Sequence, residues 1–240
     1  MKLKYKIIII ISCVFIFLYF FIILWYNGLI WPNTPSKKKY PVRGVDVSSY
    51  QGEIDWETLE NQDIDFAFIK ATEGSGYEDE NFQNASETGI RIGAYHFFSF
   101  DSSGITQAEN FIKTVPKTQN MLPPVIDLEF YAQHGSDPPE KEETRYNLQK
   151  MIDAVYDYYG LMPVIYVTDI TYELYIKGYF DDNDIWIRSI FTKAELPDER
   201  KWTFWQYCNR GRLDGYDGAE QYIDLNVFNG TKEEFENYKG

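Results

Sequence analysis

The sequence predicts an α/β barrel preceded by a single transmembrane helix. Three observations support this prediction. A run without charged residues covers residues 7–25. Eight short apolar runs then recur over residues 44–228, at intervals typical of strands separated by helices or loops. Helical segments fall between the early runs, and repeated strand–helix units favour a sheet that closes on itself.

The N-terminal apolar run is long enough to cross ~30 Å of hydrocarbon as a helix. Trp25, Tyr26 and Trp31 follow it, as interfacial aromatic residues often do. Lysines flank the run on both sides, and those before it lie closer, which favours a cytoplasmic N-terminus. We predict an uncleaved anchor. The alternatives are a cleaved signal peptide, for which the run is long and lacks a small-x-small site, and a lipoprotein signal at Cys13, past which the apolar run continues.

The composition divides the chain into three parts. Residues 1–31 form the cytoplasmic tip and the anchor, residues 32–41 a short polar linker with prolines, and residues 42–240 one domain. All six lysines of residues 1–40 lie outside the domain, so 17 of the 23 basic residues remain there against 37 acidic ones. A charge this negative argues against nucleic acid as a ligand of the domain.

Cysteine and histidine exclude two kinds of site. Cys13 lies in the apolar run and Cys208 is alone in the domain, so no disulfide forms within it. Two histidines, His96 and His134, do not make a zinc cluster, whereas carboxylate ligation of Mg²⁺ or Ca²⁺ stays open. We predict no metal, no cofactor and no required protein partner.

The expected strands are the eight apolar runs. They cover residues 44–48, 66–71, 92–98, 125–130, 164–167, 185–188, 202–207 and 222–228. Expected helices cover residues 55–62, 78–89, 104–115, 141–159 and 169–178, and Gly160 is placed to end the fourth of these. After about residue 180 the spacings suit loops more than helices, so we expect the barrel to be incompletely covered on its outside.

The run at residues 125–130 carries the strongest functional signal. Asp127 and Glu129 are two positions apart, so on a strand they face the same side, ~6.5–7 Å apart. Two like charges on a buried strand are costly unless they are paired or protonated. Glycoside hydrolysis requires such a pair, one group to protonate the leaving oxygen and another to stabilise or attack the sugar carbon. The alternative is a strand end with two solvated acids.

Other polar residues are expected at the same end of the barrel, where chemistry gathers in such folds. Asp46 and Asp224 lie within apolar runs of the first and last strands, which are neighbours in a closed barrel, so these acids should converge. Each remaining candidate also has a structural interpretation: Lys70 and Glu73 as an ordinary ion pair, His96 as a core histidine, and Tyr166 as packing. Further candidates for sugar binding are Tyr95, Trp205, Gln206 and Tyr207.

The chain also resembles a known family. The motifs that carry the resemblance are GVDVSSYQG at 44–52, IDW at 54–56, FIKATEG at 68–74, GAYHF at 93–97, DLE at 127–129, WQY at 205–207 and DLN at 224–226. In this order, over about residues 42–230, they resemble the family 25 glycoside hydrolases, muramidases often called Chalaropsis-type lysozymes. Two departures from the family pattern are Tyr50, where many members carry Trp, and Cys208, where small hydroxyl residues are common.

The resemblance implies a flattened, irregular TIM-like barrel with about eight strands and five helices. It implies hydrolysis of the β-1,4 bond between N-acetylmuramic acid and N-acetylglucosamine in peptidoglycan. By position, Glu129 would be the general acid, Asp127 would assist the substrate N-acetyl group or the transition state, and Asp46 and Asp224 would complete the site. With the anchor, the enzyme would be a single-pass membrane protein facing the cell wall, or a secreted one if the anchor is cleaved. The rival functions are a non-catalytic glycan-binding protein on the same fold and a chitinase-like hydrolase.

Overall fold

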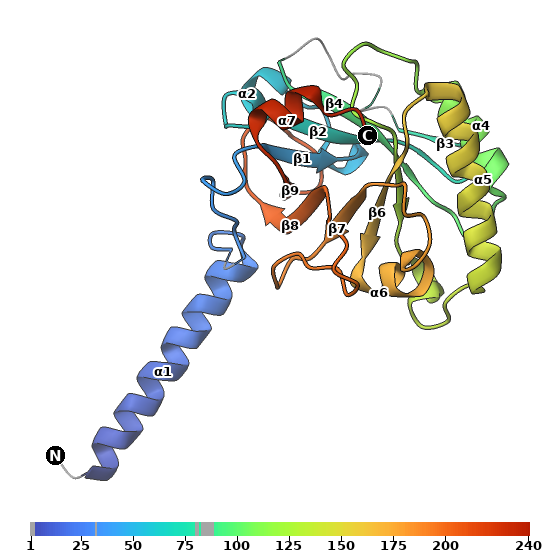
Figure 1. Cartoon of the computed structure of the whole chain (residues 1–240). Coiled ribbons are helices and arrows are strands. Elements are labelled where there is room, and N and C mark those ends of the chain that lie inside the picture. The colour runs from blue at the N-terminus through green and yellow to red at the C-terminus, as the bar shows by residue number, and fades with distance from the viewer. Residues whose placement is uncertain (1–2, 32, 80–81, 83–88) are drawn as a thin grey trace.

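The computed structural model describes residues 3–31, 33–79, 82 and 89–240. An apolar helix, α1 (Leu3–Tyr26), extends away from the rest of the chain, which forms one domain around a barrel (Figure 1). No residue of α1 is buried, and its length and composition suit a membrane span. The predicted order of an apolar helix followed by an α/β barrel is therefore confirmed.

Eight strands close the barrel. They are β1 (Arg43–Val47), β2 (Phe66–Glu73), β4 (Arg91–Phe97), β5 (Val125–Leu128), β6 (Val164–Thr168), β7 (Ile185–Arg188), β8 (Phe204–Gly211) and β9 (Ile223–Phe228). Neighbours from β1 round to β8 are parallel, whereas β9 runs antiparallel to both β8 and β1. A two-residue strand, β3 (Tyr77–Glu78), pairs with the end of β2. All eight predicted strands are present.

Alternate residues of each strand face the inside of the barrel, as the two-residue period requires. A cluster of large side chains fills the interior near the end where the parallel strands begin. It includes Phe66, Phe68, Trp186 and Phe204. Gly44 provides room for them, since a Cβ atom there would lie 2.4 Å from the ring of Phe66. The opposite faces of the strands pack outward against the helices, in two separate apolar clusters.

Helices cover only part of the outside. They are α2 (Trp56–Glu60), α4 (Gly104–Thr114), α5 (Lys141–Tyr159), α6 (Asp169–Thr171), which continues as a π-helix over Tyr172–Ile176, and α7 (Lys232–Asn237). The predicted helix over residues 78–89 falls largely on residues 80–81 and 83–88, which lie outside the described part of the chain. The connections after β7 and β8 contain no helix, which confirms the incomplete cover predicted there.

The sequence analysis missed α7. A capping box begins this helix, with Thr231 and Glu234 each accepting a hydrogen bond from the other residue's backbone N–H. Phe235 of α7 packs on Phe66 and Phe228 in the barrel interior. The helix therefore closes the end of the barrel where the parallel strands begin.

The segment after α1 is bonded to the barrel. We call residues 26–31 and 33–35 the neck. Arg210 donates a hydrogen bond of 2.8 Å to the carbonyl oxygen of Tyr26, and Arg212 one of 2.6 Å to that of Asn27. Trp31 Nε1 donates to the carbonyl oxygen of Tyr207 at 2.6 Å. These contacts hold residues 26, 27 and 31 against β8 and the residue just after it.

Candidate active site

Four carboxyl groups meet inside the barrel at one end. Asp46 comes from β1, Asp127 from β5, Glu129 from just after β5, and Asp224 from the start of β9. They line a cavity of about 390 Å³. The other residues that line it are Val47, Ser48, Tyr50, Gln51, Lys70, Tyr95, Phe97, Tyr166, Trp186, Arg188, Gln206, Asn209, Glu220 and Tyr222. The convergence of all four acids agrees with the sequence prediction.

Asp46 and Asp224 face each other because β9 is reversed. The two residues are direct partners in the antiparallel register between β1 and β9. A residue at the beginning of β9 thereby reaches the end of the barrel where the parallel strands finish, and the sequence analysis did not predict this reversal. Gln206 Nε2 donates to both carboxyls, at 2.9 Å to Asp46 and 3.1 Å to Asp224. Asn226 Nδ2 also donates to Asp46, at 2.7 Å.

Asp46 and Asp224 influence each other's ionisation. Burial raises the pKa of both Asp46 and Asp224. The hydrogen bonds from Asn226 and Gln206 oppose this rise for Asp46, and a hydrogen bond from Asp224 does so too. The charge of Asp46 and the hydrogen bond between the two acids raise the pKa of Asp224 further, well above its ordinary value. Of the two carboxyls, Asp224 is therefore the one whose pKa is raised more strongly, so it is the more inclined to hold a proton.

Asp127 and Glu129 form the second pair. Asp127 is 7% exposed, and burial followed by the charge of Glu129 raises its pKa well above the ordinary value. One oxygen of Asp127, Oδ1, is buried and has no hydrogen-bond partner among the residues that the structure describes. Burial also raises the pKa of Glu129, which Asp46 increases and the cations Arg188 and Lys70 oppose. Both groups therefore keep a proton to higher pH than an ordinary carboxyl does, which is the direction that a general acid requires.

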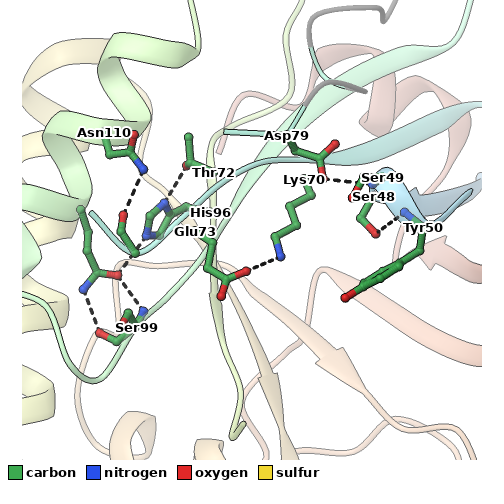
Figure 2. Close-up of polar contacts among 12 residues, drawn as sticks. Ser48, Ser49, Tyr50, Lys70, Thr72, Glu73, Asp79, His96, Ser99 and Asn110 are labelled. Carbon is green, nitrogen blue, oxygen red and sulfur yellow. Dashed lines mark hydrogen bonds and ion pairs between the residues drawn. The ribbon is translucent and has the colours of Figure 1, made fainter. Parts of the chain in front are cut away.

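Two tyrosines and a lysine complete the interior wall. Tyr166 donates to Gln206 Oε1 at 3.0 Å, which fixes the amide whose other end binds Asp46 and Asp224. Tyr95 lies in the same wall, and burial with four neighbouring carboxyls raises its pKa well above the ordinary value, so it stays a neutral donor. Lys70 reaches the cavity and pairs with Glu73 at 2.6 Å, as Figure 2 shows.

Several predicted substrate-binding residues lie outside this cavity. His96 is fully buried and bonds to Thr72 at 2.7 Å (Figure 2) and to Gln107 of α4 at 3.0 Å. Burial lowers its pKa to about 4. Trp205 donates to the carbonyl oxygen of Ser189, and the Tyr207 hydroxyl accepts from Arg43. Glu73 is not part of the cavity lining, although its partner Lys70 is. His96, Trp205 and Tyr207 therefore serve packing and hydrogen bonding outside the barrel.

Strand alternation explains this division. Gln206 faces inward on β8, so its neighbours Trp205 and Tyr207 face outward. Tyr95 faces inward on β4, so His96 faces outward. The same rule identifies two interior residues that the sequence analysis missed: Arg188, two positions after Trp186 on β7, and Asn226, two positions after Asp224 on β9. Arg188 brings a positive charge among the acids and lowers the pKa of Glu129, Asp46 and Asp224.

No metal site is evident in the described part of the chain, where no group of three or more His, Cys, Asp or Glu side chains is arranged to hold an ion. A larger cavity, about 1210 Å³, lies at the opposite end of the barrel, near Ile64, Arg91 and Phe235. It also borders residues 82 and 89, next to the undescribed segment. The buried acids that face one another lie in the smaller cavity, so that is the candidate active site.

The raised pKa of Asp224 predicts a pH-dependent gain in stability for Asp224→Asn. An acid whose pKa is higher in the folded state stabilises the fold below the unfolded value of 3.8, and this contribution is lost as pH rises through the folded pKa. Asn cannot ionise, so the variant should be more stable at pH 7 by on the order of 1–2 kcal/mol. The gain should disappear below about pH 4.

Urea unfolding of the full chain in detergent, followed by tryptophan fluorescence at pH 7 and at pH 3.5, measures this difference. Asp153→Asn, on the exposed face of α5, is the matched control and should leave stability nearly unchanged at both pH values. A variant of Asp224 that is less stable than the parent at pH 7 would show that the carboxylate is stabilised by its partners.

The chain is similar to several known proteins. The model of the glycosyl hydrolases family 25 matches residues 45–216. The structure is similar to that of a family 25 glycosyl hydrolase from Bacillus anthracis, with 55% identity, a TM-score of 0.81, and coverage of 87% of this chain and 97% of that one. It is also similar to a bacterial lysozyme from Streptomyces coelicolor, with 28% identity, a TM-score of 0.70, and coverage of 82% and 96%.

A curated relative extends the comparison at the level of sequence. Lysozyme M1 from Streptomyces globisporus is 31% identical over 213 residues, which are 79% of this chain and 68% of that protein. The family model covers most of the barrel, from Val45 in β1 to the connection before β9, and so includes Asp127 and Glu129. The chain therefore belongs to the glycosyl hydrolases family 25.

Proposed function

We propose that this protein is a muramidase that hydrolyses the β-1,4 bond between N-acetylmuramic acid and N-acetylglucosamine in peptidoglycan. The observation that carries the proposal is the pair Asp127 and Glu129 in an open cavity, where burial raises the pKa of both. A glycosidase needs an acid that is protonated near neutral pH beside the scissile oxygen. The lysozymes among the relatives support the substrate class.

Glu129 is the proposed general acid. It lies just beyond the end of β5, at the rim of the cavity, and is less buried than Asp127. It donates its proton to the glycosidic oxygen as the bond to the anomeric carbon breaks, and the resulting carboxylate later takes a proton from water. Arg188 and Lys70 limit the rise of its pKa, so that the group still ionises after it has donated.

Asp127 is the proposed partner of the substrate's 2-acetamido group. Its buried Oδ1 has an unused capacity to accept a hydrogen bond, and an unpaired buried oxygen of this kind is costly in the free protein. An acetamido N–H supplies the missing donor. Held in this way, the acetamido oxygen attacks the anomeric carbon as the leaving oxygen takes the proton of Glu129, and water then opens the cyclic intermediate.

Asp46 and Asp224 support this step from the other side of the cavity. In this proposal Asp224 carries a proton, and Asp46 supplies one negative charge, held by Gln206 and Asn226, where positive charge develops at the sugar carbon. Tyr95, Tyr166, Lys70 and Gln206 line the same cavity and are proposed substrate-binding residues. Glu73 has an indirect role, through its ion pair with Lys70.

Mass spectrometry of muropeptides released from purified peptidoglycan tests the function. We expect products with N-acetylmuramic acid at the new reducing end. Products with N-acetylglucosamine at that end would indicate a glucosaminidase, and binding without any release would indicate a glycan-binding protein. Cleavage of chitin oligosaccharides with equal efficiency would favour a chitinase-like hydrolase.

The proposed location is the cell membrane, with α1 as an uncleaved single-pass anchor and the barrel facing the cell wall. The support is the length of α1, its lack of charge beyond Lys6, and the neck that holds its end against the barrel. Fractionation of a bacterial host that expresses the full chain is the test. We expect the intact protein in the membrane fraction, and a soluble secreted product that begins near residue 32 would contradict the anchor.

A further inference from the structure

The end of α1 contacts the loop that follows β7. The loop after β7 carries Phe191, whose ring centroid is 6.1 Å from that of Trp25 in the last turn of α1. Trp25 also stacks on Trp31 of the neck at 6.0 Å. A helix of 24 residues is about 36 Å long, so if it spans ~30 Å of hydrocarbon its last turn lies at the membrane interface. Phe191 then lies at the interface too.

Two large apolar side chains are exposed at the same place, which also favours contact with a membrane. Phe191 is 72% exposed and Leu29 of the neck is 62% exposed, although both are large apolar side chains. Aromatic residues of this kind are favoured at the boundary between headgroups and hydrocarbon. A lipid surface would cover them without any change in the fold.

Positive charge borders the same edge. Arg210 and Arg212 bind the carbonyl oxygens of the neck, and the Arg210 guanidinium lies 4.6 Å from the ring centroid of Tyr26. The next residue but one after Phe191 is Lys193, which is exposed. Cations beside interfacial aromatic residues match the phosphates of phospholipid headgroups. Asp217, in the connection between β8 and β9, is acidic, but its carboxylate accepts a hydrogen bond from the backbone N–H of Glu53.

We propose that the edge formed by Phe191, Lys193, Arg210 and Arg212 binds the phospholipid surface beside α1, so that the barrel rests on the membrane. This proposal depends on the anchoring of α1 and not on the reaction. Tyr222 connects this edge to the active site. It lines the cavity, and it donates a hydrogen bond of 3.2 Å to the carbonyl oxygen of Tyr26 at the end of α1. The lipid-binding edge therefore fixes the height of the cavity above the membrane.

The depth of a fluorescent label in vesicles tests the proposal. The full chain carries Cys13→Ala, while Cys208 stays, because burial raises the pKa of its thiol to about 12 and keeps it unreactive. Lys193→Cys receives an environment-sensitive label and retains Phe191. Tyr146→Cys on α5, where Tyr146 is 63% exposed, is the matched control. Both proteins are inserted into phosphatidylcholine vesicles that contain a lipid-attached quencher at the headgroup level.

We expect several-fold stronger quenching at position 193 than at position 146. Adding Phe191→Asp to the Lys193→Cys protein should reduce quenching toward that of the control, while flotation with the vesicles is unchanged. Equal quenching at the two positions in protein that floats with the vesicles would overturn the lipid-binding edge and leave the anchor intact. Protein that does not float would refute both the edge and the anchor, whereas muropeptide release is measured separately and reports only on the function.

Discussion

Glu129→Gln should lower peptidoglycan hydrolysis by about 10³-fold or more, because the amide cannot donate a proton to the leaving oxygen. Gln has nearly the same volume, and Glu129 is only partly buried at the end of β5, so the fold should be retained. Release of reducing ends from purified cell walls measures the rate, and urea unfolding in detergent checks the fold.

Glu109→Gln is the matched control for this variant. Glu109 is exposed on α4, outside the cavity, so the same substitution there should leave the rate unchanged. The pH dependence gives a second check. Since burial raises the pKa of Glu129, the rate in the parent enzyme should fall as pH rises through that pKa, where the acid is lost. Near-normal turnover of Glu129→Gln would assign the acid to another group.

Asp127→Asn should be nearly as damaging, with a loss of about 10²-fold or more, because the acetamido group would lose its orienting partner. Asp224→Asn should be milder, about tenfold or roughly 1.4 kcal/mol in the barrier, since it removes electrostatic support and no attacking group. The two variants are compared by kcat/KM on the same peptidoglycan. Each is nearly isosteric with the parent residue, so differences in rate report on charge and hydrogen bonding.

Altered substrates separate the possible reaction routes. If the acetamido oxygen attacks, a glycan whose muramic acid has another group in place of N-acetyl should not be cleaved by the intact enzyme. If such a glycan is cleaved, or if mass spectrometry detects a glycosyl group trapped on one of the four carboxyls, the substrate is not the nucleophile. A carboxylate of the enzyme would then attack directly, and Asp127 would be the first to examine.

Much of the barrel could be predicted because its strands follow simple rules. Apolar runs marked all eight strands, and Gly160, in a left-handed conformation with φ of 71°, ends α5 as predicted. The meeting of Asp46 and Asp224 was also predicted, from closure alone. Their proximity depends on an antiparallel last strand, which no local pattern in the sequence indicated.

Three predicted residues lie outside the cavity for a common physical cause. His96, Trp205 and Tyr207 are polar or aromatic residues near strand ends, but each is next to a residue that faces the cavity, and neighbours on a strand face opposite sides. Strict use of the two-residue period would have selected Arg188 and Asn226 instead. The capping box before α7 was readable in the sequence, but a helix of six residues gives little periodicity to detect.

The pairing of β1 with β9 has a consequence for biosynthesis. The two strands are separated by almost the whole domain, so the ladder that aligns Asp46 with Asp224 forms only after residue 228 is free to fold. A chain that has folded only as far as β8 has most strands but no closed barrel, and the two halves of its acid cluster remain apart. The acid cluster is therefore complete only after the last strand has paired, and a slip of one residue in that last ladder would turn Asp224 outward.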